Sequence, residues 1–436
     1  MINLLYFPTR YFPSISGAEL YIQRLAEILN DRRGYNVDVV TSNAIDFNGL
    51  RSKNGKCITP SEKYYDEVNN LKINRFRIDY MHSIEEKIDI IKKKKSFKSL
   101  NLSEECLKKF IENGPYIKDL IPNFINNQKE YDLIHTTFFP YFNLILTLIM
   151  GRNLNIPTVC TPFFHFANPR YLDDSFIEIL PKFDKIIACT QLEKKILEKK
   201  IITDKHKIEV IPMGVDFEIF NNFPPRKHKH IKFKKKFFQH NEEKYKMVLF
   251  CGYKNYEKGA ISILKSIPYI LRKYKKVYFI FIGPSTYAFN LELTKVRKND
   301  HTRILNFTPD NLKGYFDKYK LAAFNETDIY LMPSRSDAFG IAFLEAWASG
   351  KPVIGANIGA TPQVIRNNID GLLVNFDQPE EIAEKVIYLL KHRNQRFKLG
   401  KAGRDKVLKK YTWNKVVDRT SNLYKTLVNN NKRDYI

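Results

Sequence analysis

The chain has 436 residues, of which 44% are hydrophobic. A length of this order fits two or three domains, and the apolar fraction is enough for sizeable cores, which excludes a wholly disordered chain. Lysine and arginine number 72 against 47 aspartate and glutamate, a formal net charge of +25. So basic a chain is expected to meet an anionic partner such as phosphate groups, an anionic membrane face or nucleic acid, although a lysine-rich composition bias explains the same excess.

The five cysteines are widely spaced and form no C-x-x-C pair. This pattern is typical of free thiols in a reducing compartment rather than of disulfides or a zinc site. The amino terminus lacks the basic segment and cleavage site of a signal peptide. The most apolar stretch, Leu144–Met150, is far shorter than the roughly 20 residues that span a bilayer. We therefore expect a soluble, cytoplasmic protein.

The first part of the chain alternates strands with helices. Ile2–Phe7 is predicted as a strand, Ala18–Asn30 has the apolar spacing of a helix, and Val37–Thr41 is a second strand. This alternation predicts a parallel sheet covered on both faces. Further strands are predicted at Leu133–His135, Thr158–Cys160, Lys185–Cys189 and Ile208–Ile211.

Residues from about 45 to 130 are less regular, and we interpret them as an insertion with helices, including a basic one at Glu85–Lys93. The first unit is predicted to end at Pro212–Asp216, and the basic, proline-containing stretch Phe223–Lys236 is predicted to be a linker or the segment immediately after one. The pattern then restarts, which predicts two doubly wound units over 1–214 and 215–414, with ligands bound at the carboxyl ends of their strands. In the second unit, strands are predicted at Met247–Cys251, Val277–Ile282, Ile329–Met332 and Pro352–Gly355, and helices at Ala260–Tyr274 and Asn414–Asn429.

The most informative stretch is Tyr330–Gly350, in which a strand runs through a loop into a helix. Gly340 permits close backbone approach, and the helix start offers unpaired N–H groups to a diphosphate. Two carboxylates beside such a site, Asp337 and Glu345, are suited to bind sugar and ribose hydroxyls. The same pattern also fits Asp337 as the helix N-cap and Glu345 as a solvated helix residue.

This stretch resembles the E-x7-E signature of the retaining glycosyltransferases of family 4, also described as glycosyl transferases group 1, which have the GT-B fold. The resemblance implies that Glu345 binds the donor ribose and that Asp337, one C–C bond shorter than the usual Glu, faces the donor sugar. It implies two Rossmann-like domains facing each other across a cleft. The acceptor side is 1–214, completed by a returning helix in 415–436, and the nucleotide-sugar side is 215–414.

A second match, Phe250–Gly259, resembles the G-R-x-x-x-x-K-G loop of that family. Lys258 takes the place of the lysine that neutralises the donor diphosphate. The usual arginine is Tyr253, so Lys254 is the candidate for the second cation, as a point charge rather than a fork. An ordinary surface turn has the same composition. The donor contacts implied are Gly17, Lys254, Lys258, Gly283, Ala338, Phe339, Gly340, Ile341 and Glu345.

The first domain carries two further matches. Phe12–Glu19 resembles the family loop P-x-x-G-G-x-E, with Gly17 placed for close backbone approach. Pro157–Phe166 resembles the segment that ends in a histidine near the reacting sugar, so His165 joins Asp337 and Glu345 as a candidate catalytic residue. His135 is the second choice. A turn glycine and a histidine packed among phenylalanines are the structural alternatives.

The resemblance implies a retaining transferase that moves a hexose-type sugar from a UDP- or GDP-sugar to a lipid-linked or polysaccharide acceptor at the cytoplasmic membrane face. No D-x-D motif is placed to hold a metal, so we expect no metal and no cofactor beyond the nucleotide-sugar co-substrate. The alternatives are a phosphorylase or epimerase of the same fold and a non-catalytic nucleotide-sugar-binding protein. The basic runs at 92–95 and 226–236 lack a recognisable nucleic-acid module, so peripheral contact with anionic lipid is the preferred interpretation of the charge.

Overall fold

The computed structural model describes residues 1–32, 34–120, 130–200, 205–224, 231–298, 303–312 and 314–433. It divides into two compact units. The first consists of Met1–Pro212 with Val416–Ile436, and the second of Met213–Lys415. The sequence placed the division after residue 214 and the start of the returning segment at 415.

The sheet of the first unit has the strand order β3-β4-β2-β1-β5-β6-β7-β8. Leu4 of β1 lies opposite Val37 of β2 on one side and opposite Leu133 of β5 on the other, with both pairs parallel. The strand order therefore reverses between β1 and β5, and a crevice at the carboxyl ends of such strands is where α/β sheets bind ligands. The strands are β1 Ile2–Phe7, β2 Tyr35–Ser42, β3 Glu67–Val68, β4 Leu71–Phe76, β5 Leu133–Thr137, β6 Thr158–Thr161, β7 Lys185–Ala188 and β8 Ile208–Val210.

Helices of the first unit begin and end where local chemistry favours it. The Ser16 side chain caps α1 by accepting a hydrogen bond from the Ala18 N–H, and Asn155 ends α6 in the left-handed conformation. Most of α6 is buried, which explains its continuous apolar sequence. The helices are α1 Gly17–Asn30, α2 Ile84–Lys92, α3 Lys95–Lys98, α4 Glu104–Asn113, α6 Asn143–Leu154, α7 Asp174–Ile177 and α8 Gln191–Lys200, with short 3-10 turns at Lys63–Tyr65, Pro169–Leu172, Leu180–Lys182 and Lys205–Lys207.

The irregular segment from 45 to 130 contains the expected helices and also two strands, β3 and β4, that the sequence did not predict. Helices α2 to α4 contribute Ile88, Phe97 and Phe110 to the same core as α6. Strand β4 pairs in parallel with β2, with Ile73 opposite Val39. Within this segment, residues 121–129 lie outside the part of the chain that the structure describes.

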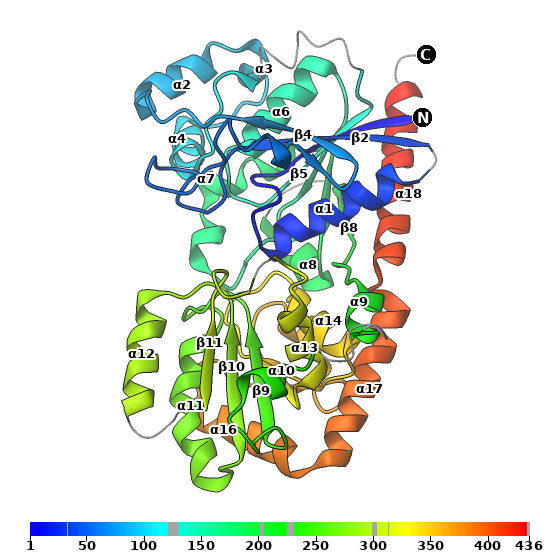
Figure 1. The fold of residues 1–436 in the computed structure, drawn as a ribbon. Helices are drawn as coiled ribbons and strands as arrows, with labels where there is room; N and C mark the ends of the chain where they lie inside the picture. The colour runs from blue at the N-terminus through cyan, green and yellow to red at the C-terminus, as the bar shows by residue number, and fades with distance from the viewer. Residues whose placement is uncertain are drawn as a thin grey trace. The chain divides into compact units, whose positions relative to one another are not determined.

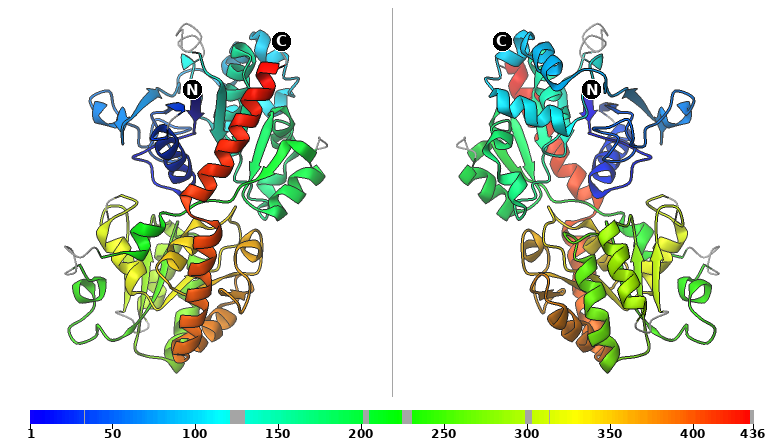
Figure 2. Two further views of the ribbon diagram at one scale, coloured as in Figure 1. Left: turned by 90° about the vertical axis from the view of Figure 1, so that its right-hand side faces the viewer. Right: turned by 90° about the vertical axis from the view of Figure 1, so that its left-hand side faces the viewer.

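The last helix, α18 Trp413–Arg433, joins the first unit from residue 416 onward. The Tyr424 hydroxyl lies 3.0 Å from that of Tyr6 in β1, and the Tyr35 hydroxyl lies 2.5 Å from Ser421 Oγ. Figure 2 shows this part of α18, in red, beside the first-unit strands. Buried polar contacts of this kind fix the returning helix in one register.

The sheet of the second unit has the order β11-β10-β9-β12-β13-β14 and is parallel throughout the described pairs. Its order reverses between β9 and β12. Since parallel crossovers are right-handed, the helix after β9 and the helix after β12 cover opposite faces of the sheet. The strands are β9 Lys246–Cys251, β10 Val277–Ile282, β11 Ile304–Phe307, β12 Ile329–Met332, β13 Val353–Ala356 and β14 Leu372–Val374.

The helices of the second unit form two groups that match this topology (Figure 1). α11 packs against α12 and α16, whereas α14 packs against α9, α13 and α17. The loops after β9 and β12 therefore lead into helices on either side of the reversal point. The helices are α9 Phe217–Asn221, α10 Phe233–Phe237, α11 Ala260–Lys273, α12 Tyr287–Lys298, α13 Lys318–Glu326, α14 Ile341–Ala348, α15 Thr361–Val364, α16 Pro379–Lys391 and α17 Arg393–Lys410.

The basic stretch over 223–236, predicted to be a linker or the segment immediately after one, is partly folded into the second unit. Residues 225–230 lie outside the described residues, but α10 follows at Phe233–Phe237. The rings of Phe233 and Phe237 lie 5.5 and 4.8 Å from that of Phe307. This half of the stretch is therefore the segment that follows a linker, the second of the two predicted interpretations, because its phenylalanines have a core to pack against.

Candidate functional site

Lys258 and Asp337 lie together where the strand order of the second unit reverses. Lys258 follows β9 and Asp337 follows β12. The Lys258 ammonium donates to an Asp337 carboxylate oxygen at 2.8 Å and approaches the Ser336 carbonyl at 3.4 Å. The two side chains are 23% and 13% exposed, so the pair is accessible to a ligand. The structure thus places two predicted site residues at the expected edge of the sheet.

A second ion pair joins the same two loops. Arg335 after β12 pairs with both carboxylate oxygens of Glu257 after β9, with Nε at 3.0 Å from Oε2. The Glu257 carbonyl also accepts from the Arg335 N–H at 2.8 Å and from the Ser334 hydroxyl at 3.1 Å. Gly259 has a φ of +76°, and a Cβ there would lie 2.2 Å from the Pro333 carbonyl oxygen. These contacts hold Lys258 and Asp337 in register, and the motifs did not predict them.

Gly340 caps α14 with a φ of +90° and no side-chain hydrogen bond. A Cβ at this position would lie 2.6 Å from the Phe343 ring, so a larger residue does not fit. Asp337 is therefore not the helix N-cap, which removes that alternative. An uncapped helix start leaves first-turn N–H groups for an anion. Ala338, Phe339 and Ile341 flank this start, as their predicted role as backbone donors requires, and their contact with a donor stays a prediction.

Glu345 lies in α14 and is 2% exposed, so it is not a solvated helix residue. Its carboxylate oxygen lies 3.2 Å from the ammonium of Lys320 in α13, whose side chain is 8% exposed. The sequence contains no motif that points to Lys320. The carboxylate predicted to bind the donor ribose is therefore already partnered by a buried cation.

Lys254 does not supply the second cation beside Lys258, and this prediction is wrong. Its ammonium is fully buried and donates to the Asn306 side-chain oxygen at 2.5 Å and to the Phe307 carbonyl at 2.9 Å. Both acceptors belong to β11, on the side of β9 away from β12. Burial lowers the pKa of Lys254 to about 8. Tyr253, which stands at the arginine position, is 47% exposed and brings no positive charge.

Gly283 directly follows β10 and has a φ of +132°, and a Cβ there would lie 2.1 Å from the Gly252 carbonyl oxygen. The loops after β9 and β10 meet at this point: the Lys254 N–H donates to the Pro284 carbonyl at 2.8 Å, and the Thr286 hydroxyl donates to the Lys254 carbonyl at 2.7 Å. This close approach accounts for the glycine. Its contact with a donor stays a prediction.

In the first unit, Gly17 is the first residue of α1, in the connection that follows β1. The preceding loop is held by a buried pair in which Arg10 lies 2.9 Å from the Glu19 carboxylate. The Arg10 guanidinium also lies 3.7 Å from the centre of the Phe47 ring. Gly17 therefore stands at the reversal point of its own sheet, between β1 and β5.

His165 lies in the loop after β6 and is half-buried, with its ring 5.1 Å from that of Tyr171. Phe163, two residues earlier, has a φ of +49°, a strained value for a residue with a side chain. Strain of this kind persists only where the surroundings hold it, and it clusters at functional sites. The Phe164 N–H between them donates to the Glu193 carboxylate at 3.0 Å.

Glu193 is fully buried at the start of α8, and motif reasoning missed it. It also accepts the Cys189 N–H at 2.7 Å, and its own N–H donates to the Thr190 hydroxyl at 3.1 Å. The spacing of Thr190 and Glu193 is that of a capping box, a signal that the sequence does contain. Burial raises the pKa of Glu193 to about 7, although its backbone hydrogen bonds oppose the rise.

His135, the second choice for a catalytic histidine, is structural. Its side chain is fully buried, with Nδ1 2.5 Å from the Tyr424 hydroxyl and Nε2 2.8 Å from Thr161 Oγ1. Burial lowers its pKa to about 3, so the ring is neutral near pH 7. A histidine with both nitrogens engaged inside the core has no path to a substrate.

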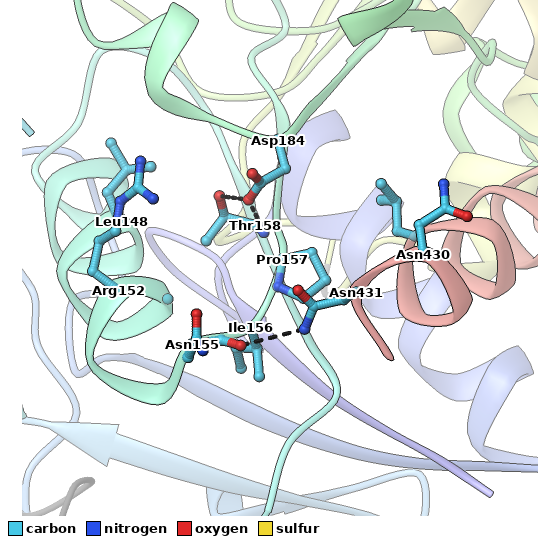
Figure 3. A pocket seen from close by; sticks show the side chains of 11 residues that line it. Leu148, Arg152, Asn155, Ile156, Pro157, Thr158, Asp184, Asn430 and Asn431 are labelled. Atoms are coloured by element: carbon cyan, nitrogen blue, oxygen red, sulfur yellow. Dashed lines mark hydrogen bonds between the residues drawn. The ribbon is translucent and has the colours of Figure 1, made fainter. Parts of the chain in front are cut away.

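A surface pocket of about 240 Å³ lies elsewhere in the first unit, at the amino-terminal ends of β6 and β7 (Figure 3). Asn155, Asn430 and Asn431 form part of its wall, and the Asp184 carboxylate is engaged by the Thr158 N–H at 2.7 Å. It contains no predicted site residue and lies at the opposite end of the strands from His165. We assign no part of the site to it.

Two features are absent from the described ranges of the chain. No group of three or more His, Cys, Asp and Glu side chains is arranged there to hold a metal ion. Within the same ranges, no helix has both the length and the apolar content needed to cross a membrane. Metal independence stays a prediction.

Comparisons with known proteins identify the class. The profile described as "Glycosyl transferases group 1" matches residues 232–406, and that of "Glycosyltransferase Family 4" matches residues 101–219. An uncharacterized glycosyltransferase of Methanocaldococcus jannaschii is 24% identical over 94% of both chains. A GDP-mannose-dependent phosphatidylinositol monomannoside mannosyltransferase of Mycobacterium tuberculosis is 28% identical over 36% of this chain and 41% of its own.

Among solved structures, HepE of Anabaena in complex with UDP and glucose superposes with a TM-score of 0.71 at 15% identity, covering 98% of this chain and 100% of its own. At that identity the likeness establishes the fold. The chain belongs to the family 4, group 1 glycosyltransferases and has the GT-B fold, which confirms the resemblance. It is therefore an enzyme, a glycosyltransferase, as the sequence predicted.

Proposed function

We propose that the enzyme transfers a hexose-type sugar from a UDP- or GDP-sugar, with retention of the anomeric configuration and without a metal ion. The observation that carries the proposal is the Lys258–Asp337 pair, with 2.8 Å between the ammonium and the carboxylate, beside the uncapped start of α14. A diphosphate leaving group needs positive charge and N–H donors at one place. HepE, which shares the fold and binds UDP, supports the same class of donor.

In this mechanism Lys258 and the first-turn N–H groups of α14 stabilise the negative charge that develops on the departing diphosphate. Asp337 accepts hydrogen bonds from the donor sugar and Glu345 from the donor ribose. His165 contacts the reacting sugar from the first unit. The acceptor hydroxyl attacks the anomeric carbon on the face from which the diphosphate departs, and the proton of that hydroxyl leaves with the product diphosphate.

We propose a lipid-linked or polysaccharide acceptor at the cytoplasmic membrane face, with peripheral contact to anionic lipid. The net charge of +25 supports the contact, since basic residues near an anionic surface each add to binding. The mannosyltransferase relative, whose name gives a phosphatidylinositol mannoside acceptor, supports the lipid class. Co-sedimentation with anionic vesicles at low salt, against neutral vesicles, tests this part.

A donor screen tests the function as a whole. A ligand that binds only the folded state raises the melting temperature, so the correct nucleotide sugar should stand out among UDP- and GDP-hexoses. With that donor, release of nucleoside diphosphate is measured with and without membrane lipid extracts, and NMR reads the anomeric configuration of the product. An inverted product overturns retention. A stabilising donor that never turns over with any acceptor overturns the proposed reaction.

A further inference from the structure

The Glu345 carboxylate belongs to a buried cluster between α13 and α14. The Lys320 ammonium lies 3.2 Å from one carboxylate oxygen, and both side chains are less than a tenth exposed. Tyr315 lies close to the same carboxylate, and desolvation together with that negative charge raises the pKa of Tyr315 well above its usual value. The acid therefore has a fixed cationic partner on α13.

Aromatic rings hold the Lys320 ammonium in turn. It lies 3.6 Å from the centre of the Tyr315 ring, 5.7 Å from that of Phe324 and 5.9 Å from that of Phe220. A cation over such ring faces is stabilised electrostatically, and more strongly when water is excluded. The ammonium is therefore confined at one position beside Glu345.

This arrangement determines what Glu345 can accept. An ionised carboxylate has about four acceptor positions. Lys320 uses one of them, which leaves acceptor positions for a pair of hydroxyl groups.

We propose that Lys320 is a positioning residue for the donor. It holds the Glu345 carboxylate in the orientation in which the carboxylate accepts hydrogen bonds from the 2′- and 3′-hydroxyls of the donor ribose. The inference rests on the proposed function, in which Glu345 binds that ribose. If the ion pair only joined α13 to α14, it would stabilise the fold, and the preference for ribose would not depend on the charge at position 320.

The test compares UDP and GDP with their 2′-deoxy analogues by calorimetric titration of the full chain. Wild type is expected to prefer the ribose form about tenfold, the value of one hydrogen bond to a charged acceptor. Lys320→Gln, which loses the cation, is expected to reduce the preference to about twofold or less. Lys320→Arg should keep most of it. Lys318→Gln, an exposed lysine on the same helix, is the matched control and should keep all of it.

A second variant keeps the inference testable if Lys320→Gln does not fold. Lys320→His carries a cation only at low pH, so its ribose preference is expected to decline between about pH 5.5 and about pH 8, which a structural role would not produce. A full preference in folded Lys320→Gln, a pH-independent preference in Lys320→His, or a wild type without any preference would each overturn the inference. If neither UDP nor GDP binds to wild type, the proposed function itself fails.

Discussion

Lys258 and Asp337 form an ion pair of 2.8 Å across the two loops that flank the strand reversal of the second unit. The cation that is proposed to bind the donor diphosphate is thus held, before any donor arrives, by the carboxylate that is proposed to bind the donor sugar. A diphosphate must compete with Asp337 for Lys258. Donor binding and sugar contact are therefore linked through one pair of side chains.

The first prediction concerns Asp337→Asn. The amide keeps the size of the side chain but releases Lys258, so free UDP or GDP should bind roughly threefold more tightly, the scale of a partly exposed ion pair. Turnover with the full nucleotide sugar should fall by about tenfold, because the sugar loses a charged acceptor. Titration calorimetry and steady-state kinetics measure the two effects, with Asp310→Asn, an exposed loop aspartate, as the control. Weaker nucleotide binding in Asp337→Asn would contradict the competition.

The second prediction concerns Lys254→Met. Removal of the ammonium leaves the Asn306 side-chain oxygen without this donor, while the Phe307 carbonyl keeps the Gly283 N–H at 3.0 Å. The unfolding free energy should therefore fall by about 1–3 kcal/mol. Nucleotide affinity should stay within about twofold of wild type, because the Lys254 ammonium is directed toward β11. Urea unfolding and titration with UDP or GDP measure the two quantities. A large loss of nucleotide affinity with an unchanged unfolding free energy would contradict this prediction and would indicate that Lys254 binds the donor.

His165→Ala tests the first-unit contribution. If His165 contacts the reacting sugar, kcat should fall at least about tenfold, and up to about a thousandfold if it also transfers a proton. Donor affinity should be unaffected, since the proposed diphosphate contacts lie in the second unit. Stopped assays of diphosphate release at saturating donor give kcat, and His240→Ala at an exposed position is the control. An unchanged kcat removes His165 from the site.

Glu193 gives a prediction about pH. Burial raises its pKa from 4.5 to about 7. A carboxyl whose pKa is raised on folding contributes stability that is complete below its unfolded pKa and is lost as the pH rises through the folded pKa. The unfolding free energy of wild type relative to Glu193→Gln should therefore decline from about pH 5 to about pH 8, by roughly 2–3 kcal/mol. Urea unfolding at several pH values measures it, and a constant difference would mean that Glu193 does not titrate in this range.

The sequence predicted strands well where tertiary context adds little. Val277–Ile282 is a continuous apolar run, and β10 has the same bounds because both faces of the sheet are covered. Strand β4 was missed because Lys72 and Asn74 interrupt its apolar residues, which suits its place beside the edge strand β3. The sequence of a segment indicates whether its two faces are buried, but it does not indicate which strand the segment pairs with.

The motifs located Lys258, Asp337, Gly340 and Glu345 correctly on their loops and helix, because the spacing along a strand–loop–helix unit is local. They failed for Lys254, since its side-chain direction depends on an acceptor in β11, more than fifty residues away along the chain. The role of Lys320 could not be predicted for the same reason, because its partner Glu345 lies on another helix. The local sequence pattern predicts on which loop or helix a residue lies, whereas tertiary packing determines which residues its side chain contacts.

The most direct test of the central claim, a diphosphate site at Lys258, is a comparison of nucleoside diphosphate with monophosphate. Titration calorimetry is run with UDP against UMP and GDP against GMP, on wild type, Lys258→Gln and the exposed control Lys265→Gln. We predict that the matching diphosphate binds wild type and the control at least about tenfold more tightly than its monophosphate, and that Lys258→Gln loses most of this difference. Equal diphosphate preference in Lys258→Gln and wild type would contradict the claim.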